Sequence, residues 1–159
     1  MIAIVAAGSI SWGLMRSDRI FRAKERTART ENLLVTVAGD FFPLYGAIQR
    51  LQPDIARMHD RPPTVGNTKD QLGRLKLAIS ARLNEAMALS IDMDTAIIDP
   101  LRQCIMSATA YNAFLGELVN SWPFDPAEWP NAMDRLEANR KMTEDFARQL
   151  ADHYQNRAN

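Results

Sequence analysis

The stretch that decides the fold is DPLRQCIMSATAYNAFLGELVNS, residues 99–121. Asp99 is a good N-cap residue, and Pro100 suits the first helical position because proline has no N–H to leave unpaired there. Apolar residues then recur every three or four positions, as on the buried face of an amphipathic helix. We therefore predict a long helix that ends near Ser121 and Trp122. Its apolar stripe consists of Leu101, Cys104, Ile105, Ala108, Tyr111, Leu115, Leu118 and Val119.

The same reasoning predicts a helix on each side of this one. The clearest linker in the chain is residues 61–66, RPPTVG, because consecutive prolines disfavour helix before them. After it, Asn67 or Thr68 offers an N-cap for a long helix, and the last helix is expected to begin near Asn131. The apolar positions are Leu72, Leu75, Ile79, Leu83, Ala86 and Met87 in the first of these helices, and Met133, Leu136, Met142, Phe146, Leu150 and Tyr154 in the second.

Prolines and aromatic residues mark two further boundaries. Residues 33–48 are mostly apolar, and we expect Asp40 to cap a core helix that begins directly after it. The Gln52-Pro53-Asp54 stretch is expected to kink that helix or to start a short new one. Near residues 123–130, where prolines are frequent, we expect Trp122 and Trp129 to be buried where two helices meet.

Composition indicates one folded domain with an uneven charge distribution. The chain has 159 residues, of which 47% are hydrophobic and 24% charged, values that argue against disorder. The formal net charge is zero, but residues 16–30 contain six basic residues and only two acids. A basic segment therefore leads into a mildly acidic body, and such a segment suits anionic lipid, nucleic acid or an acidic partner.

The first fifteen residues, MIAIVAAGSISWGLM, carry no charged side chain. As a helix they would extend about 22 Å, less than the roughly 30 Å hydrocarbon core of a bilayer. Trp12, followed by Arg16 and Arg19, nevertheless resembles the aromatic and cationic belt of a membrane interface. A cleaved signal peptide fits poorly, because its positive charges precede the apolar stretch and here they follow it.

The arginines that follow lie along one helical face, since Arg19, Arg22, Arg26 and Arg29 are spaced three, four and three apart. If the apolar segment inserts, this charge keeps the body on the cytoplasmic side. The alternative is that residues 1–15 are a buried helix or strand and the arginines a solvated face. The predicted membrane-surface or partner contacts are Trp12, Arg16, Arg19, Arg22, Arg26 and Arg29.

A second interpretation of the N-terminus is a dinucleotide-binding turn, with Ala6, Gly8 and Ser11 at the positions of the three glycines. Residues 33–37 would then be the second strand and Asp40 the ribose-binding acid. Only one of the three glycines is present, and the interval from Gly8 to Asp40 exceeds the usual spacing of about 20 residues. The chain also lacks the alternating strands and helices of a parallel sheet, so this interpretation is disfavoured.

Few residues suggest chemistry. His59 and His153 lie far apart without ligand-spaced partners, which is typical of isolated surface histidines. Cys104 falls in an apolar stripe and is expected to be a core residue. Asp92 and Asp94, with Asp99 nearby, could share a divalent cation, but capping a turn is the favoured role. We predict no catalytic residue, cofactor or metal site.

Together these patterns predict an all-α protein, a small up-and-down helical bundle preceded by an apolar N-terminal segment and a basic helix. Residues 1–30 form the N-terminal unit and residues 31–159 the helical body. We expect a non-enzymatic, membrane-associated interaction protein, an accessory subunit or scaffold, that binds another protein or a second copy, with membrane lipid as a further candidate. The alternatives are a cytoplasmic helical protein with a small-ligand or catalytic pocket and, least favoured, a regulator that binds nucleic acid through its basic segment.

Overall fold

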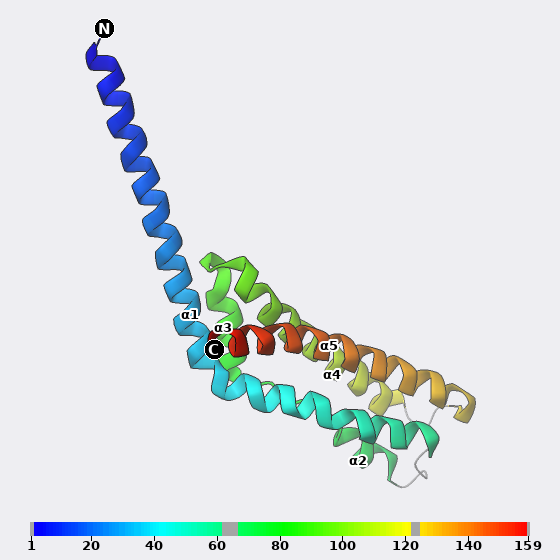
Figure 1. Ribbon diagram of the computed structural model, residues 1–159. Helices are drawn as coiled ribbons and strands as arrows, with labels where there is room; N and C mark the ends of the chain where they lie inside the picture. Colours follow the sequence, from blue (N-terminus) through cyan, green and yellow to red (C-terminus); the bar gives the residue numbers. More distant parts are fainter. Residues whose placement is uncertain (1, 62–66, 122–124, 159) are drawn as a thin grey trace.

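The computed structural model describes residues 2–61, 67–121 and 125–158, and these residues contain helices and no strand (Figure 1). The three long helices pack in a bundle, which confirms the prediction of an all-α fold. Residues 62–66 of the linker predicted at 61–66, and Trp122, lie outside the described residues. In chain order the elements are α1 (Ile2–Asp60), α2 (Thr68–Gly73), α3 (Ala81–Leu89), the 3-10 turn η1 (Ser90–Asp92), α4 (Thr95–Ser121), the 3-10 turn η2 (Pro126–Glu128) and α5 (Trp129–Ala158).

The facing sides of α1 and α5 are seams in which buried residues alternate at spacings of three and four. This heptad spacing is the pattern of helices that pack knobs into holes at a small crossing angle. Met142, which we predicted to be buried, is exposed because the seam of α5 passes through Arg140 and Thr143 instead. The seams consist of Thr30, Leu34, Val37, Phe41, Leu44, Ile48, Leu51, Ile55 and Met58 on α1, and Trp129, Met133, Leu136, Arg140, Thr143, Ala147 and Leu150 on α5.

Polar side chains of α5 also bind the backbone of α1 at three levels. The residue numbers of the bonded partners run in opposite directions, so the two helices are antiparallel. Each bond satisfies a side-chain donor inside the bundle, where an unpaired polar group would be costly. The bonds run from Trp129 Nε1 to the Met58 carbonyl (2.8 Å), from Arg140 Nη1 to the Ile48 carbonyl (3.3 Å) and from the Tyr154 hydroxyl to the Leu34 carbonyl.

The apolar stripe predicted for residues 101–119 is buried from Leu101 to Leu118 and partly buried at Val119, and α4 ends at Ser121. Cys104 and Trp129 are both buried, which confirms the core role predicted for each. The start of α4 differs from the prediction, since the helix begins at Thr95 and contains Pro100. Asp94 caps it, because its carboxylate accepts from the Ala96 N–H at 3.1 Å.

The largest correction concerns α1, which is one helix from Ile2 to Asp60 and contains Pro43 and Pro53. Asp40 is therefore not an N-cap, and residues 33–37 are helical, so the dinucleotide-binding interpretation is wrong. Because Pro43 has no N–H, the Gly39 carbonyl loses its normal helical partner. Figure 1 shows α1 bending where its colour passes from blue to cyan, the region of Gly39 and Pro43. The helix bends there and does not end, since buried residues on both sides of the proline pack in the same core.

The second correction is that the single helix predicted after Asn67 is broken into α2 and α3 by residues 74–80. Here Leu75 and Leu77 are buried while the residues between and after them are exposed, the alternation of an extended segment. The segment is bonded to α4 through both backbone groups of Leu77, which pair with the Asn112 side chain at 2.9 and 2.8 Å. The Tyr111 hydroxyl donates to the Leu75 carbonyl at 3.0 Å. These bonds replace the helical ones that the segment gives up.

Candidate functional site: the N-terminal arm of the first helix

The N-terminal part of α1 extends away from the other helices (Figure 1). We call residues 2–29 the arm. Among the described side chains, which begin at Met15, Thr30 is the first that is buried. At about 1.5 Å per residue, the arm is roughly 42 Å long. The predicted boundary at residue 30 stays a prediction.

The root of the arm is fixed to the body by Thr30. Its hydroxyl donates to the Arg26 carbonyl at 2.8 Å and accepts from the Asp94 N–H at 3.0 Å. The second bond connects α1 to the turn between η1 and α4, 64 residues later in the chain. The backbone around Asp94 is therefore held against the helix at the point where the arm begins.

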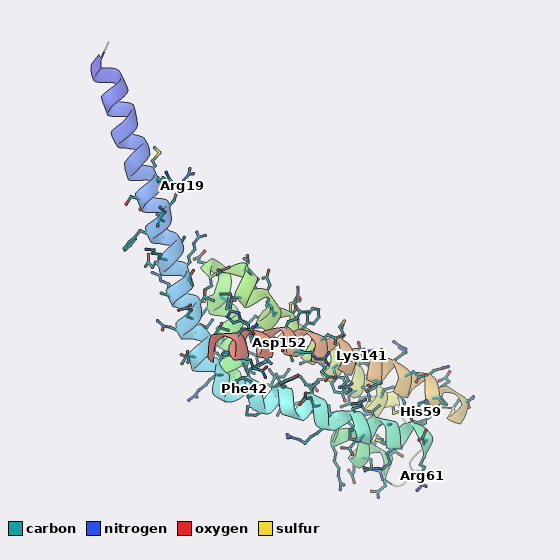
Figure 2. The ribbon with its side chains drawn as sticks, viewed as in Figure 1. Arg19, Phe42, His59, Arg61, Lys141 and Asp152 are labelled. Atoms are coloured by element: carbon teal, nitrogen blue, oxygen red, sulfur yellow. The ribbon has the colours of Figure 1, made fainter. Side chains whose placement is uncertain are left out.

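The five arginines predicted as contacts are exposed on the arm, as Figure 2 shows for Arg19. Two of them pair with acids one turn earlier, Arg22 with Asp18 at 2.7 Å and Arg29 with Glu25 at 2.6 Å. Such exposed pairs add only about 0.3–0.5 kcal/mol each to helix stability. The guanidinium groups of Arg19 and Arg26 form no hydrogen bond or ion pair with the described residues. The side chain of Trp12, the sixth predicted contact, lies outside the described residues.

A pocket of about 160 Å³ lies at the root of the arm. Its lining combines three of the predicted arginines, Arg22, Arg26 and Arg29, with Glu25 and Asp92. Sequence reasoning treated Asp92 as part of a separate turn and did not bring it to the arginines. The structure brings it there because η1 is bonded to α1 through Asp94 and Thr30.

Large apolar side chains accompany the arginines on the arm. Phe21 is 68% exposed and Ile20 50% exposed, and Met15 is exposed as well. Two more, Val35 and Phe42, are exposed where α1 has joined the bundle. Exposed phenylalanine and isoleucine on a basic helix are the composition of a segment that binds an interface or another protein.

The other end of α1 carries a second candidate, a pocket of about 270 Å³ beside α5. His59 is at the surface as predicted, with a side chain 39% exposed, but it is not isolated. Its Nδ1 lies 3.4 Å from Asp60 and its Nε2 3.5 Å from Asp134. Figure 2 shows it at the end of the bundle far from Arg19. In the described chain no group of three or more histidine, cysteine or acidic side chains is placed to hold a metal ion.

His153 departs from its predicted surface position, because its Nε2 atom is buried without a hydrogen-bond partner in the described chain. Cys104 is inert by its surroundings, since burial raises the pKa of its thiol to about 12. Asp94 has the capping role that we favoured for it, whereas Asp99 accepts from Arg102 at 3.1 Å.

Arg140 is a buried charge in the middle of the bundle, with a side chain only 3% exposed. It donates to Glu137 from Nε at 2.7 Å and from Nη2 at 2.8 Å, and to Glu144 from Nη1 at 2.8 Å. These hydrogen bonds, first the one to Glu137, raise the pKa of Arg140 above its usual value, although burial opposes the shift. The bond from Arg140 lowers the pKa of Glu144 below its usual value. The network joins α5 to the Ile48 carbonyl of α1 and is structural.

In the described part of the chain, no helix combines the length and the apolar character needed to cross a membrane. No protein-family model matches the sequence, and neither a curated protein nor a solved structure is significantly similar to it.

Proposed function

We propose that the protein is a membrane-associated scaffold, in which the arm attaches to the membrane and an up-and-down bundle on the cytoplasmic side presents a surface to a partner protein. The observation that carries the proposal is the continuity of α1. One helix contains the apolar N-terminal segment, the arginine face and the seam that packs in the bundle. Attachment of its N-terminus therefore positions the whole body.

The proposal does not require a spanning helix. Residues 2–15 extend about 21 Å as a helix, more than half of the roughly 30 Å hydrocarbon core. That length suits insertion into one leaflet, or a tilted position at the interface. In the tilted position, the exposed Ile20 and Phe21 would reach into the boundary between headgroups and acyl chains.

The charge of the arm supports the same placement. The arginines begin at Arg16, directly after the apolar segment, at the depth where phosphate groups lie when that segment is inserted. Each basic residue near an anionic surface contributes about 1 kcal/mol of attraction. The excess of arginine on this side of the apolar segment favours a cytoplasmic location for the body.

The test compares membrane partitioning of the full chain with that of residues 16–159, before and after a high-salt wash. Association that resists salt and is lost with residues 1–15 is the expected result. Salt-sensitive binding that survives the deletion would assign attachment to the arginine face at the surface. If both proteins stay in the aqueous fraction with neutral and with anionic vesicles, the membrane proposal is wrong.

A second candidate function is supported by the pocket beside His59. Its lining combines the apolar side chains of Ile55 and Met133 with the carboxylates of Asp134 and Glu137, a combination that suits a small cationic ligand. A reproducible ligand-induced rise in melting temperature, lost in His59→Ala, would favour this function. Unchanged melting across a library of small amines would count against it.

A further inference from the structure

We infer that the pocket at the root of the arm binds a phosphate group, and that Asp92 competes with that group for the arginines. The inference deepens the proposed membrane association and rests on it for the source of the phosphate, an anionic lipid headgroup. The pocket itself is lined by Arg22, Glu25, Arg26 and Arg29 on α1 and by Asp92 on η1, and Glu25 is already paired with Arg29 at 2.6 Å.

Three arginines on one helical face form a suitable phosphate site. Each guanidinium presents a planar fork of donors that matches two phosphate oxygens. Residues three and four apart on a helix have Cβ atoms about 5–6 Å apart, so these long side chains can reach a common anion. Arg26 has no acceptor in the described chain, and the acids that pair with Arg22 and Arg29 are exposed and bind weakly. A phosphate can therefore replace those acids.

The dimensions of the pocket fit this ligand. A volume of about 160 Å³ would hold roughly five water molecules at about 30 Å³ each. A phosphate group, one phosphorus with its oxygens, is smaller than this. The remaining space allows the rest of a lipid headgroup to leave the pocket along the arm.

Asp92 gives the pocket a built-in competitor. Its turn is held in place on one side by the Asp94 N–H, which donates to Thr30 at 3.0 Å. On the other side Ser90 donates to the Met87 carbonyl at 2.7 Å and accepts from Arg102 at 3.1 Å. Asp92 is exposed and lines the same pocket as the arginines, but it forms no ion pair with them in the described chain. Its negative charge attracts the arginines when no phosphate is bound and repels a phosphate, which lowers the affinity of the site for phosphate.

The experiment uses five charge-neutralising variants of the full chain beside the wild type, two matched pairs and one further control. Asp92→Asn is paired with Asp70→Asn, an exposed aspartate on α2. Arg26→Gln is paired with Arg19→Gln, which removes the same charge from the same face of the arm but lies outside the pocket lining. Arg61→Gln, at the far end of the bundle in Figure 2, controls for charge alone.

Two probes separate the sources of phosphate. One is inorganic phosphate, titrated against arginine Nε–Hε signals in the NMR spectrum. The other is vesicles of phosphatidylcholine with phosphatidic acid, assayed by flotation. Asp92→Asn is expected to tighten binding about fivefold and Arg26→Gln to weaken it about fivefold, the effect of one charge near an anionic surface. Arg19→Gln should weaken the binding of vesicles but not of inorganic phosphate. Asp70→Asn and Arg61→Gln should leave the binding of both probes unchanged.

The outcomes distinguish this inference from the membrane proposal. If the variants rank in affinity as expected with both probes, the pocket binds phosphate itself. The same order with vesicles alone means that it recognises the lipid headgroup. If no variant binds vesicles but the order holds for inorganic phosphate, the membrane proposal fails and the pocket remains. The inference is overturned if Arg26→Gln equals Arg19→Gln and Asp92→Asn equals Asp70→Asn with both probes, or if no protein binds either.

Discussion

Replacing Arg140 with alanine is expected to destabilise the bundle by about 2–4 kcal/mol, because two carboxylates and a core carbonyl lose their donor. The side chain lies in the seam of α5 that faces α1 and is almost completely buried. It makes three short hydrogen bonds to Glu137 and Glu144 and a longer one to the Ile48 carbonyl. Its loss therefore acts at the contact between the two helices.

The magnitude follows from how buried each partner is. Removing one member of a fully buried ion pair costs about 3–5 kcal/mol. The Glu137 side chain is 34% exposed and regains water when the arginine is removed, which reduces that cost. The Glu144 side chain is only 14% exposed, but it keeps a second partner, Arg148, at 3.2 Å. Loss of the arginine's aliphatic packing adds to the cost, so we expect about 2–4 kcal/mol.

A combined variant tests the electrostatic part of this reasoning. Arg140→Met keeps apolar volume in the seam but removes the Arg140 donor from both carboxylates, of which only Glu144 keeps another partner, Arg148. Adding Glu137→Gln and Glu144→Gln removes those charges, and apolar replacement of a buried ion network is often neutral or stabilising. The triple variant is therefore expected to be more stable than Arg140→Met alone by more than about 1 kcal/mol.

The measurement is the free energy of unfolding in urea, followed by far-ultraviolet circular dichroism and extrapolated to water. Lys141→Ala is the matched control, since Lys141 is the next residue and is exposed (Figure 2). It should change stability by less than about 0.5 kcal/mol. A loss in Arg140→Ala no larger than in Lys141→Ala would refute the reasoning. So would a triple variant that is no more stable than Arg140→Met.

Three other predictions follow from the same contacts. The pKa of Glu144 is lowered in the fold because Arg140 donates to it, so its stabilisation is complete above its usual pKa of 4.5 and is lost as the pH falls through the lower folded value. Glu144→Gln should therefore flatten the fall in unfolding free energy as the pH drops below 4.5, the usual pKa of the carboxyl group, and equal slopes in both proteins would contradict this. Asn112→Ala removes both bonds to Leu77 and should cost about 1–3 kcal/mol and speed amide exchange there, whereas an unchanged exchange rate would show that the bonds do not hold the segment. Cys104, with a pKa of about 12, should react with a thiol reagent at pH 8 only as the protein unfolds, and rapid labelling of the native protein would disprove its burial.

The parts of the fold that the sequence predicted are those determined by local spacing. The stripe from Leu101 to Leu118 and the end of α4 near Ser121 follow from a single amphipathic pattern and its stop signal. The burial of Cys104 and Trp129 follows from the same logic. Each of these features depends on residues within a few turns of one another, and helical periodicity reports such features directly.

The break in the helix at residues 74–80 had a signal in the sequence, which we set aside in favour of a helical pattern. Leu75, Leu77 and Ile79 alternate with other residues, which is the period of an extended segment, yet Leu75 and Ile79 also fit a helical stripe. The bonds that decide between the two come from Tyr111 and Asn112, about 35 residues away. Only tertiary contacts could show which period prevails.

The continuity of α1 was predictable in part. Buried positions alternate at spacings of three and four from Thr30 to Met58 and continue across Pro43 and Pro53. That uninterrupted seam was a stronger signal than Asp40, which we took as an N-cap, or Pro53, which we took as a kink or the start of a new helix. A proline removes one hydrogen bond, but packing on both sides of it can keep the helix intact with a bend.

The candidate site, like the fold, has a part that local spacing predicted and a part that depends on tertiary contacts. The arginine face came from local spacing, and the structure places Arg22, Arg26 and Arg29 together in one pocket. The role of Asp92 could not be predicted, because the turn that carries it reaches the arm through one bond between Asp94 and Thr30. No spacing rule connects residues that lie more than 60 positions apart.

The arm and the bundle depend on each other through the helix that they share. An isolated helix forms reluctantly in water, because its first turn fixes several dihedral angles for one hydrogen bond. In α1 that nucleus is supplied by the packed seam from Thr30 to Met58, so each residue of the arm only extends an existing helix. The Thr30 bond to Asp94 then prevents the root from turning freely. If the arm attaches to a membrane as proposed, this rigid joint fixes which face of the bundle a partner meets, whereas a flexible linker at residue 30 would leave that orientation undefined.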